Sequence, residues 1–98
     1  MIVYEVTAIV EENIAQAFGT FMESQHIGDL MATGCFESAT LARAENTFQM
    51  RYKSADRQTL DQYFSEHAEK LRGDVIDRLP TGVQYSRQVW EVVREFPS

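Results

Sequence analysis

The chain has 98 residues, of which 44% are hydrophobic and 11% aromatic, enough for one globular domain with its own core. Its 15 acidic and 9 basic residues give a net charge of −6, which argues against nucleic acid and anionic membranes as partners. No apolar run approaches the roughly 18 residues of a membrane-spanning helix. The single cysteine excludes an internal disulfide and favours a cytoplasmic location.

The first two expected elements differ in the period of their apolar residues. Residues 2–10, IVYEVTAIV, alternate as a strand does, with Glu5 and Thr7 opposite the apolar face. The apolar residues that follow recur at helical spacing, which predicts a helix. Gly28 weakens this helix, and Gly34 ends it as a C-cap.

A hairpin is expected next, with strands at about 36–45 and 47–53 and Asn46 in the turn. In its second strand the apolar residues alternate with polar ones, so that Gln49 and Arg51 share one face.

A second helical region is predicted from Ser54, which serves as its N-cap, to the Leu79-Pro80 pair. Asp56 falls in its first turn, and Ser65 is where the helix restarts after a bend.

A final strand is expected over about 83–96. Trp90 and Val92 fall on one of its faces, with Val89 and Val93 on the other.

The order β-α-β-β-α-β predicts an α+β, ferredoxin-like fold in a single domain covering residues 1–98. In that fold a four-stranded antiparallel sheet carries both helical regions on one face and leaves the other face open. The open face is expected to carry Val3, Glu5, Thr7, Ile9, Gln49 and Arg51, together with one apolar pair from the last strand. Several large apolar groups are unusual on the solvent face of a small monomer, so we expect a homodimer formed through the open sheet face.

Four stretches of the chain resemble a known family: MIVYEV, HIGDLMATGCFESA, YFSEHAEKLRGDVIDRL and SRQVWEV. Together they resemble the DUF4286 family, small bacterial proteins of unknown function in the dimeric α/β-barrel group. The resemblance includes both His67 and Arg72, and it implies a ferredoxin-like protomer whose sheet packs on a partner's sheet to close a barrel. It implies no activity. A proline follows the His-Ile pair in the family pattern, where this chain has Gly28.

The histidines and the cysteine are the first candidates for chemistry. His26 lies near a helix C-terminus that suits its positive form, but a pocket beside that helix end would give it a role in ligand binding or proton transfer. His67 lies on the apolar stripe of the second helical region, which favours a structural role. Cys35 begins a strand and is interpreted as a small buried group. A Cys–His nucleophile pair has no supporting signature in the sequence.

The polar residues of the open sheet face form a second set of candidates. They are Glu5, Thr7, Gln49 and Arg51, with Arg43 or Arg87 as additions from neighbouring strands. One interpretation is an interface salt-bridge network. The other is a polar-lined cavity between two sheets, in which Arg51 holds a carboxylate and Glu5 acts as a base. Tyr85 and Trp90 are then either walls for an organic ligand or plain interface packing.

We expect neither a metal nor a cofactor. One cysteine and two histidines provide no metal-ligand set, and the five glycines are too scattered for a phosphate-binding loop.

The leading hypothesis is therefore an uncharacterised homodimeric α/β-barrel protein that binds a small organic or carboxylated molecule between its sheets. One alternative is a cofactor-independent monooxygenase- or isomerase-like enzyme, as found elsewhere in the dimeric α/β-barrel group. Another is a non-catalytic regulatory or assembly module. Fold-level analogy alone is a weak basis for choosing among them.

Overall fold

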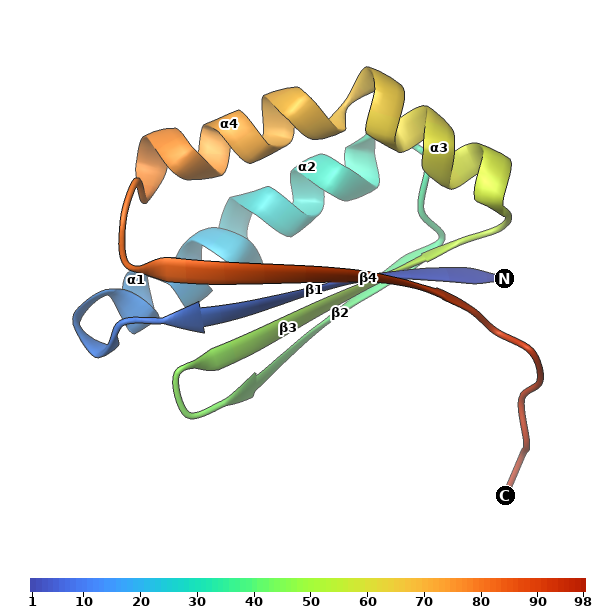
Figure 1. Ribbon diagram of the computed structural model, residues 1–98, viewed down its shortest axis with the longest axis horizontal. Helices are drawn as coiled ribbons and strands as arrows, with labels where there is room; N and C mark the ends of the chain where they lie inside the picture. The colour runs from blue at the N-terminus through green and yellow to red at the C-terminus, as the bar shows by residue number, and fades with distance from the viewer.

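A computed structural model describes residues 1–98. The elements, in chain order, are β1 (Ile2–Val10), α1 (Glu12–Phe21), a π-helical turn η1 (Met22–His26), α2 (Ile27–Ala32), β2 (Ser38–Ala44), β3 (Thr47–Ser54), α3 (Arg57–Glu66), α4 (Ala68–Arg78) and β4 (Val83–Glu91). The strands form one sheet in the order β2-β3-β1-β4, and all neighbours are antiparallel. All helices lie on one face of this sheet (Figure 1). The predicted ferredoxin-like fold is confirmed.

The core lies between the helices and the sheet, and strand alternation decides which residues enter it. Tyr4 pairs with Tyr52 and Val6 with Met50, and all four side chains are buried under the helices. The next residues along each strand point to the other face because the side-chain period of a strand is two. Phe18 of α1 is fully buried within the same core.

The first helical region continues past Gly28, the glycine that was expected to weaken it. One wide turn precedes Gly28, in which the Ile27 N–H donates to the Met22 carbonyl oxygen five residues back. Such π-helical turns occur frequently at functional sites. The region ends where Gly34 adopts a positive φ of 77°, as expected of a C-cap glycine.

The second helical region is divided at His67, whose φ of −129° is not helical. The expected bend therefore lies at His67, two residues beyond Ser65. The predicted N-cap was also wrong: the carboxylate of Asp56, not Ser54, accepts the Thr59 N–H at 2.8 Å. The buried Ser54 hydroxyl instead donates to the Cys35 carbonyl oxygen at 2.9 Å, which fastens the end of β3 to the loop before β2.

The last strand is shorter than predicted and ends at Glu91. Its partner explains why, because Glu91 pairs with Ile2, the first residue of β1. Beyond that pair the backbone makes one more hydrogen bond to this part of the chain, from the Val92 N–H to the Met1 carbonyl oxygen. The remaining residues leave the sheet on the side away from the helices (Figure 1). None of the helices is both long enough and apolar enough to span a membrane.

Candidate ligand-binding site

A cavity of about 260 Å³ lies between the helices and the sheet. Ten of its 13 lining residues are hydrophobic, and the three others are His26, Arg72 and Arg87. The volume is slightly below the range of roughly 300–1,000 Å³ found for small-molecule sites, and the lining has the usual composition of an apolar wall with few polar groups. The cavity therefore suits a small organic molecule.

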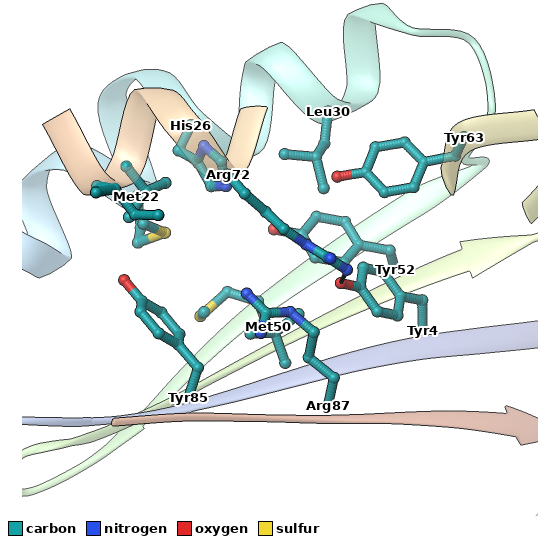
Figure 2. Close-up of a pocket in the computed structure, with 13 residues that line it drawn as sticks. Tyr4, Met22, His26, Leu30, Met50, Tyr52, Tyr63, Arg72, Tyr85 and Arg87 are labelled. Atoms are coloured by element: carbon teal, nitrogen blue, oxygen red, sulfur yellow. Dashed lines mark hydrogen bonds between the residues drawn. The ribbon is translucent and has the colours of Figure 1, made fainter. Parts of the chain in front are cut away.

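Each wall of the cavity comes from a different part of the chain. The π-helical turn η1 supplies Met22 and His26, and α4 supplies Arg72. Alternation on β4 directs Tyr85 and Arg87 toward the helices, because their partners on β1 are the inward-facing Ala8 and Val6. Figure 2 shows His26, Met22 and Tyr85 at one end of the cavity and Tyr4, Tyr52 and Tyr63 at the other.

Two polar atoms of the residues that line this cavity have no hydrogen-bond partner in the chain. They are Nδ1 of His26 and the hydroxyl oxygen of Tyr85, and both are buried. A buried polar group without a partner costs about 1–3 kcal/mol. Most buried polar groups in folded proteins are paired, so two unpaired ones lining one cavity mark it as a site for a hydrogen-bonding ligand.

Burial also fixes the protonation states of these two side chains. Desolvation lowers the pKa of His26, although the charges of Asp29 and Asp74 oppose that shift. Desolvation raises the pKa of Tyr85, against the smaller opposing effect of Arg87. At neutral pH a neutral imidazole and a protonated phenol therefore face the cavity, one able to accept a proton and the other to donate a hydrogen bond.

Two arginines enter the cavity from opposite walls, Arg72 from α4 and Arg87 from β4 (Figure 2). The guanidinium of Arg72 donates to the Tyr4 hydroxyl at 3.2 Å. The guanidinium of Arg87 lies over the Tyr85 ring, 5.2 Å from its centroid. Neither forms an ion pair with a carboxylate of the chain, whereas Arg51, Arg57 and Lys70 each do.

Most of the predicted site residues lie elsewhere, on the open face of the sheet. Register places Glu5 opposite Arg51 and Gln88, and Thr7 opposite Gln49 and Ser86. The Glu5 carboxylate lies 3.2 Å from the Arg51 guanidinium, so these two charges are paired within one chain. Trp90 is on this same face.

The helix-covered face carries three strand residues that were expected on the open face: Tyr85, Arg87 and Arg43. Tyr85 and Trp90 were both assigned as walls of one cavity, but they are five residues apart and lie on opposite faces of β4. Arg87 pairs with Val6 and Arg43 with Phe48, so both lie on the helix-covered face. Only Arg87 of these two lines the cavity.

His67 and Cys35 do not line the cavity. His67 lies in a polar surface groove between α2 and α4, with its Nε2 at 3.8 Å from the Glu66 carboxylate. Cys35 is buried in the loop before β2. No three His, Cys, Asp or Glu side chains are arranged to hold a metal ion.

Three polar residues of this site were named from the sequence: His26, and Tyr85 and Arg87 as candidates for the open face. Tyr4 and Arg72 were not among the candidate site residues. One signal was available: the odd spacing between Tyr85 and Trp90 puts the tyrosine and Arg87 on the helix side of the sheet.

Comparison with known proteins places the chain in a family. The model of the domain of unknown function DUF4286 matches residues 1–93. The chain belongs to DUF4286. No curated protein sequence matches it.

Solved structures similar to this DUF4286 chain share its fold at low sequence identity. One is SnoaB, a cofactor-independent oxygenase from Streptomyces nogalater, with a TM-score of 0.75, 10% identity, and 99% of this chain and 97% of that chain covered. Another is a dimeric ferredoxin-like protein from an uncultured marine organism, with a TM-score of 0.75, 10% identity, and coverage of 99% and 98%. A third is Rv0793 from Mycobacterium tuberculosis, with a TM-score of 0.65, 17% identity, and coverage of 97% and 98%. At these identities the likeness concerns the fold alone.

Proposed function

We propose that this protein binds a small, mainly apolar organic molecule in the cavity between its helices and its sheet. The observation that carries the proposal is the pair of buried, unpartnered atoms, His26 Nδ1 and the Tyr85 hydroxyl oxygen, on residues that line the same apolar cavity. A ligand hydroxyl or enol would accept from the tyrosine and donate to the imidazole, removing both desolvation costs at once. This site replaces the space between two sheets, where the sequence had suggested a ligand.

Isothermal titration calorimetry with 2-naphthol tests this proposal, since the probe joins a compact aromatic body to one hydroxyl. Wild type should bind it, and Tyr85→Phe should weaken binding by about 3- to 10-fold, the usual range for one lost hydrogen bond. Thr7→Val is the matched control, because it removes a hydroxyl from the opposite face of the sheet and should leave affinity unchanged. Failure of wild type to bind, or equal losses in both variants, would contradict the proposal.

We also propose that the protein acts as a homodimer joined through the open sheet face. Ile9 and Trp90, which point to that face, are 54% and 49% exposed, and removing these large apolar side chains from water would favour association through that face. One of the solved structures with this fold is a dimeric ferredoxin-like protein. In the dimer the Glu5–Arg51 pairs would lie at the interface, as the salt-bridge interpretation expects.

Multi-angle light scattering of the purified chain tests the dimer. The wild type should have twice the mass of the 11.3 kDa chain, and Ile9→Arg should be monomeric because it buries an unpaired charge in each half of the interface. Gln16→Arg, a similar change on the exposed surface of α1, should remain dimeric. A monomeric wild type would contradict this proposal and leave the cavity proposal untouched.

The neutral imidazole of His26 favours a second candidate function, an enzyme that removes a proton from its bound substrate. A base that faces an apolar cavity and stays unprotonated at neutral pH can take a proton from an acidic C–H or O–H group and return it. Solvent deuterium exchange into the enolisable C1 position of 2-tetralone, followed by NMR, measures this step directly. Wild type should accelerate exchange over buffer, and His26→Ala should not. Exchange that is equal in both proteins would reject the catalytic role of His26.

A further inference from the structure

The two arginines of the cavity share a feature that bears on the kind of ligand it takes. Both lie at its solvent-exposed side, and neither has a carboxylate partner. Although the chain has 15 acidic residues and a net charge of −6, none of them neutralises either of these two guanidinium groups. The contacts that they do make, with Tyr4 and Tyr85, are with neutral tyrosines.

Asp29 and Asp74, the two carboxylates whose charges act on His26, do not pair with either arginine. Asp74 lies 3.5 Å from Lys70, and together with Asp29 it lines the polar groove between α2 and α4 rather than the cavity. Both arginine charges act on the phenol of Tyr63, where they oppose the burial that raises its pKa. Figure 2 shows the two guanidinium groups entering the same cavity, Arg72 from the helices and Arg87 from the sheet.

From this arrangement we infer that the ligand is an organic acid, with an apolar ring system inside the cavity and an ionised oxygen group between Arg72 and Arg87. The inference rests on the proposed function, because it assumes that the cavity is a binding site. Guanidinium groups bind carboxylates through charge-assisted and often bidentate hydrogen bonds. An anion between them would also relieve the repulsion between two neighbouring positive charges.

The same arrangement predicts how the ligand is oriented in the cavity. Figure 2 shows the arginines between the His26–Tyr85 end and the tyrosine-rich end of the cavity. The acid group is therefore held beside the tyrosine-rich end, where Arg72 donates to Tyr4. A hydroxyl elsewhere on the ring system can then reach the Tyr85 and His26 atoms at the other end. The preferred class is a hydroxyaryl acid of one or two fused rings.

The test compares two probes of nearly the same shape that differ in charge, 2-naphthoate and 2-naphthamide, by calorimetry at low ionic strength. Wild type should bind the naphthoate about 10-fold more tightly or better, because only the anion gains charge-assisted bonds. Arg72→Gln and Arg87→Gln should each reduce the difference in affinity between the two probes. Raising the salt concentration should also reduce the difference in affinity between naphthoate and naphthamide, since Arg72 and Arg87 are exposed to solvent.

Arg78→Gln is the matched control, because Arg78 lies on the same helix as Arg72 but stacks on Phe21 outside the cavity lining. It should leave the gap between the two probes unchanged. Equal affinity for both probes, or a gap that persists in the Arg72→Gln/Arg87→Gln double variant, would overturn the organic-acid inference alone. If neither probe bound, the proposed function would be overturned with it.

Discussion

Polar side chains on the two faces of the sheet differ in whether they have a partner or contact with solvent. On the open face, polar side chains are partnered or exposed: Glu5 pairs with Arg51, and Thr7 lies beside Gln49 on the next strand. On the helix-covered face, polar groups are few, yet His26 Nδ1 and the Tyr85 hydroxyl are buried with no partner at all. The same four strands supply both faces.

This difference shows which polar groups are still free to bind a ligand. A paired charge at a sheet surface already has its interaction, and a ligand would have to compete for it. An unpaired buried group gains from any ligand that satisfies it. For this reason the helix-covered face, and not the more polar open face, is the better candidate for small-molecule binding.

The largest expected effect is on the packing of the helix-covered face. Phe18 is fully buried and lies 5.0 Å from the ring of Phe48, so Phe18→Ala should lower the free energy of unfolding by about 3–5 kcal/mol. Gln49→Ala on the open face should change it by less than about 0.5 kcal/mol. Urea denaturation followed by circular dichroism measures both. Similar losses in the two variants would mean that the two faces do not differ in burial as described.

Two tyrosines that differ in their partners sharpen the comparison within the cavity. Tyr4→Phe removes a hydroxyl that accepts from Arg72 and should cost about 1 kcal/mol of stability. Tyr85→Phe removes a buried hydroxyl that has no partner, so it should leave stability unchanged or raise it by up to about 1 kcal/mol while weakening ligand binding. Thermal denaturation of the ligand-free variants distinguishes them. A destabilised Tyr85→Phe would indicate that its hydroxyl is satisfied in solution.

The protonation of His26 should make stability depend on pH. Because burial lowers its folded-state pKa, the unfolded chain binds this proton more readily, and stability is lost as pH falls from the unfolded value of about 6.5 through the folded pKa. His26→Gln should remove that component of the pH dependence. Denaturant midpoints measured from pH 7.5 down to pH 5 check it. An unchanged slope in the variant would assign the pH dependence to other groups.

The smallest effect should come from the open-face ion pair. The Arg51 side chain is 49% exposed in the single chain, so in the monomeric Ile9→Arg background solvent screens its attraction to Glu5, and Arg51→Gln should cost only about 0.2–1 kcal/mol. The cost should shrink in high salt. A larger loss of stability that does not depend on salt in the monomeric protein would show that solvent screens this ion pair less than the exposure of Arg51 implies.

The sequence predicted the elements and faces of the sheet well, because strand alternation is a direct record of which side chains are buried. The ends of the elements were predicted less well where they are set by a neighbouring strand. The alternation of Val89 and Val93 continues past Glu91, but β1 has already ended there and leaves no strand to pair with. The break at His67 and the cap at Asp56 were likewise misplaced by a few residues, as local signals alone allow.

The candidate site was predicted poorly for a different reason. His26 was found because a histidine near a helix end is unusual in itself. Arg72 carries no local signal, since it is one more charged residue on an amphipathic helix, and the spacing on β4 assigns Arg87 to a face of the sheet without indicating a cavity there. Their importance comes from two elements meeting over a cavity, and from the lack of an acidic partner for either one. Neither fact can be read from residue spacing.

The measurement that most directly tests the central claim is a titration of ¹⁵N-labelled protein with 2-naphthol, followed by two-dimensional NMR. Amides of η1 and α4 contact only the helix-covered face, so they separate the two faces cleanly. Binding in the cavity predicts shifts concentrated in η1, in α4 around Arg72 and in β4 around Tyr85. Shifts confined to the strands around Thr7 and Gln49, with the helices unaffected, would place the ligand on the open face and contradict the account.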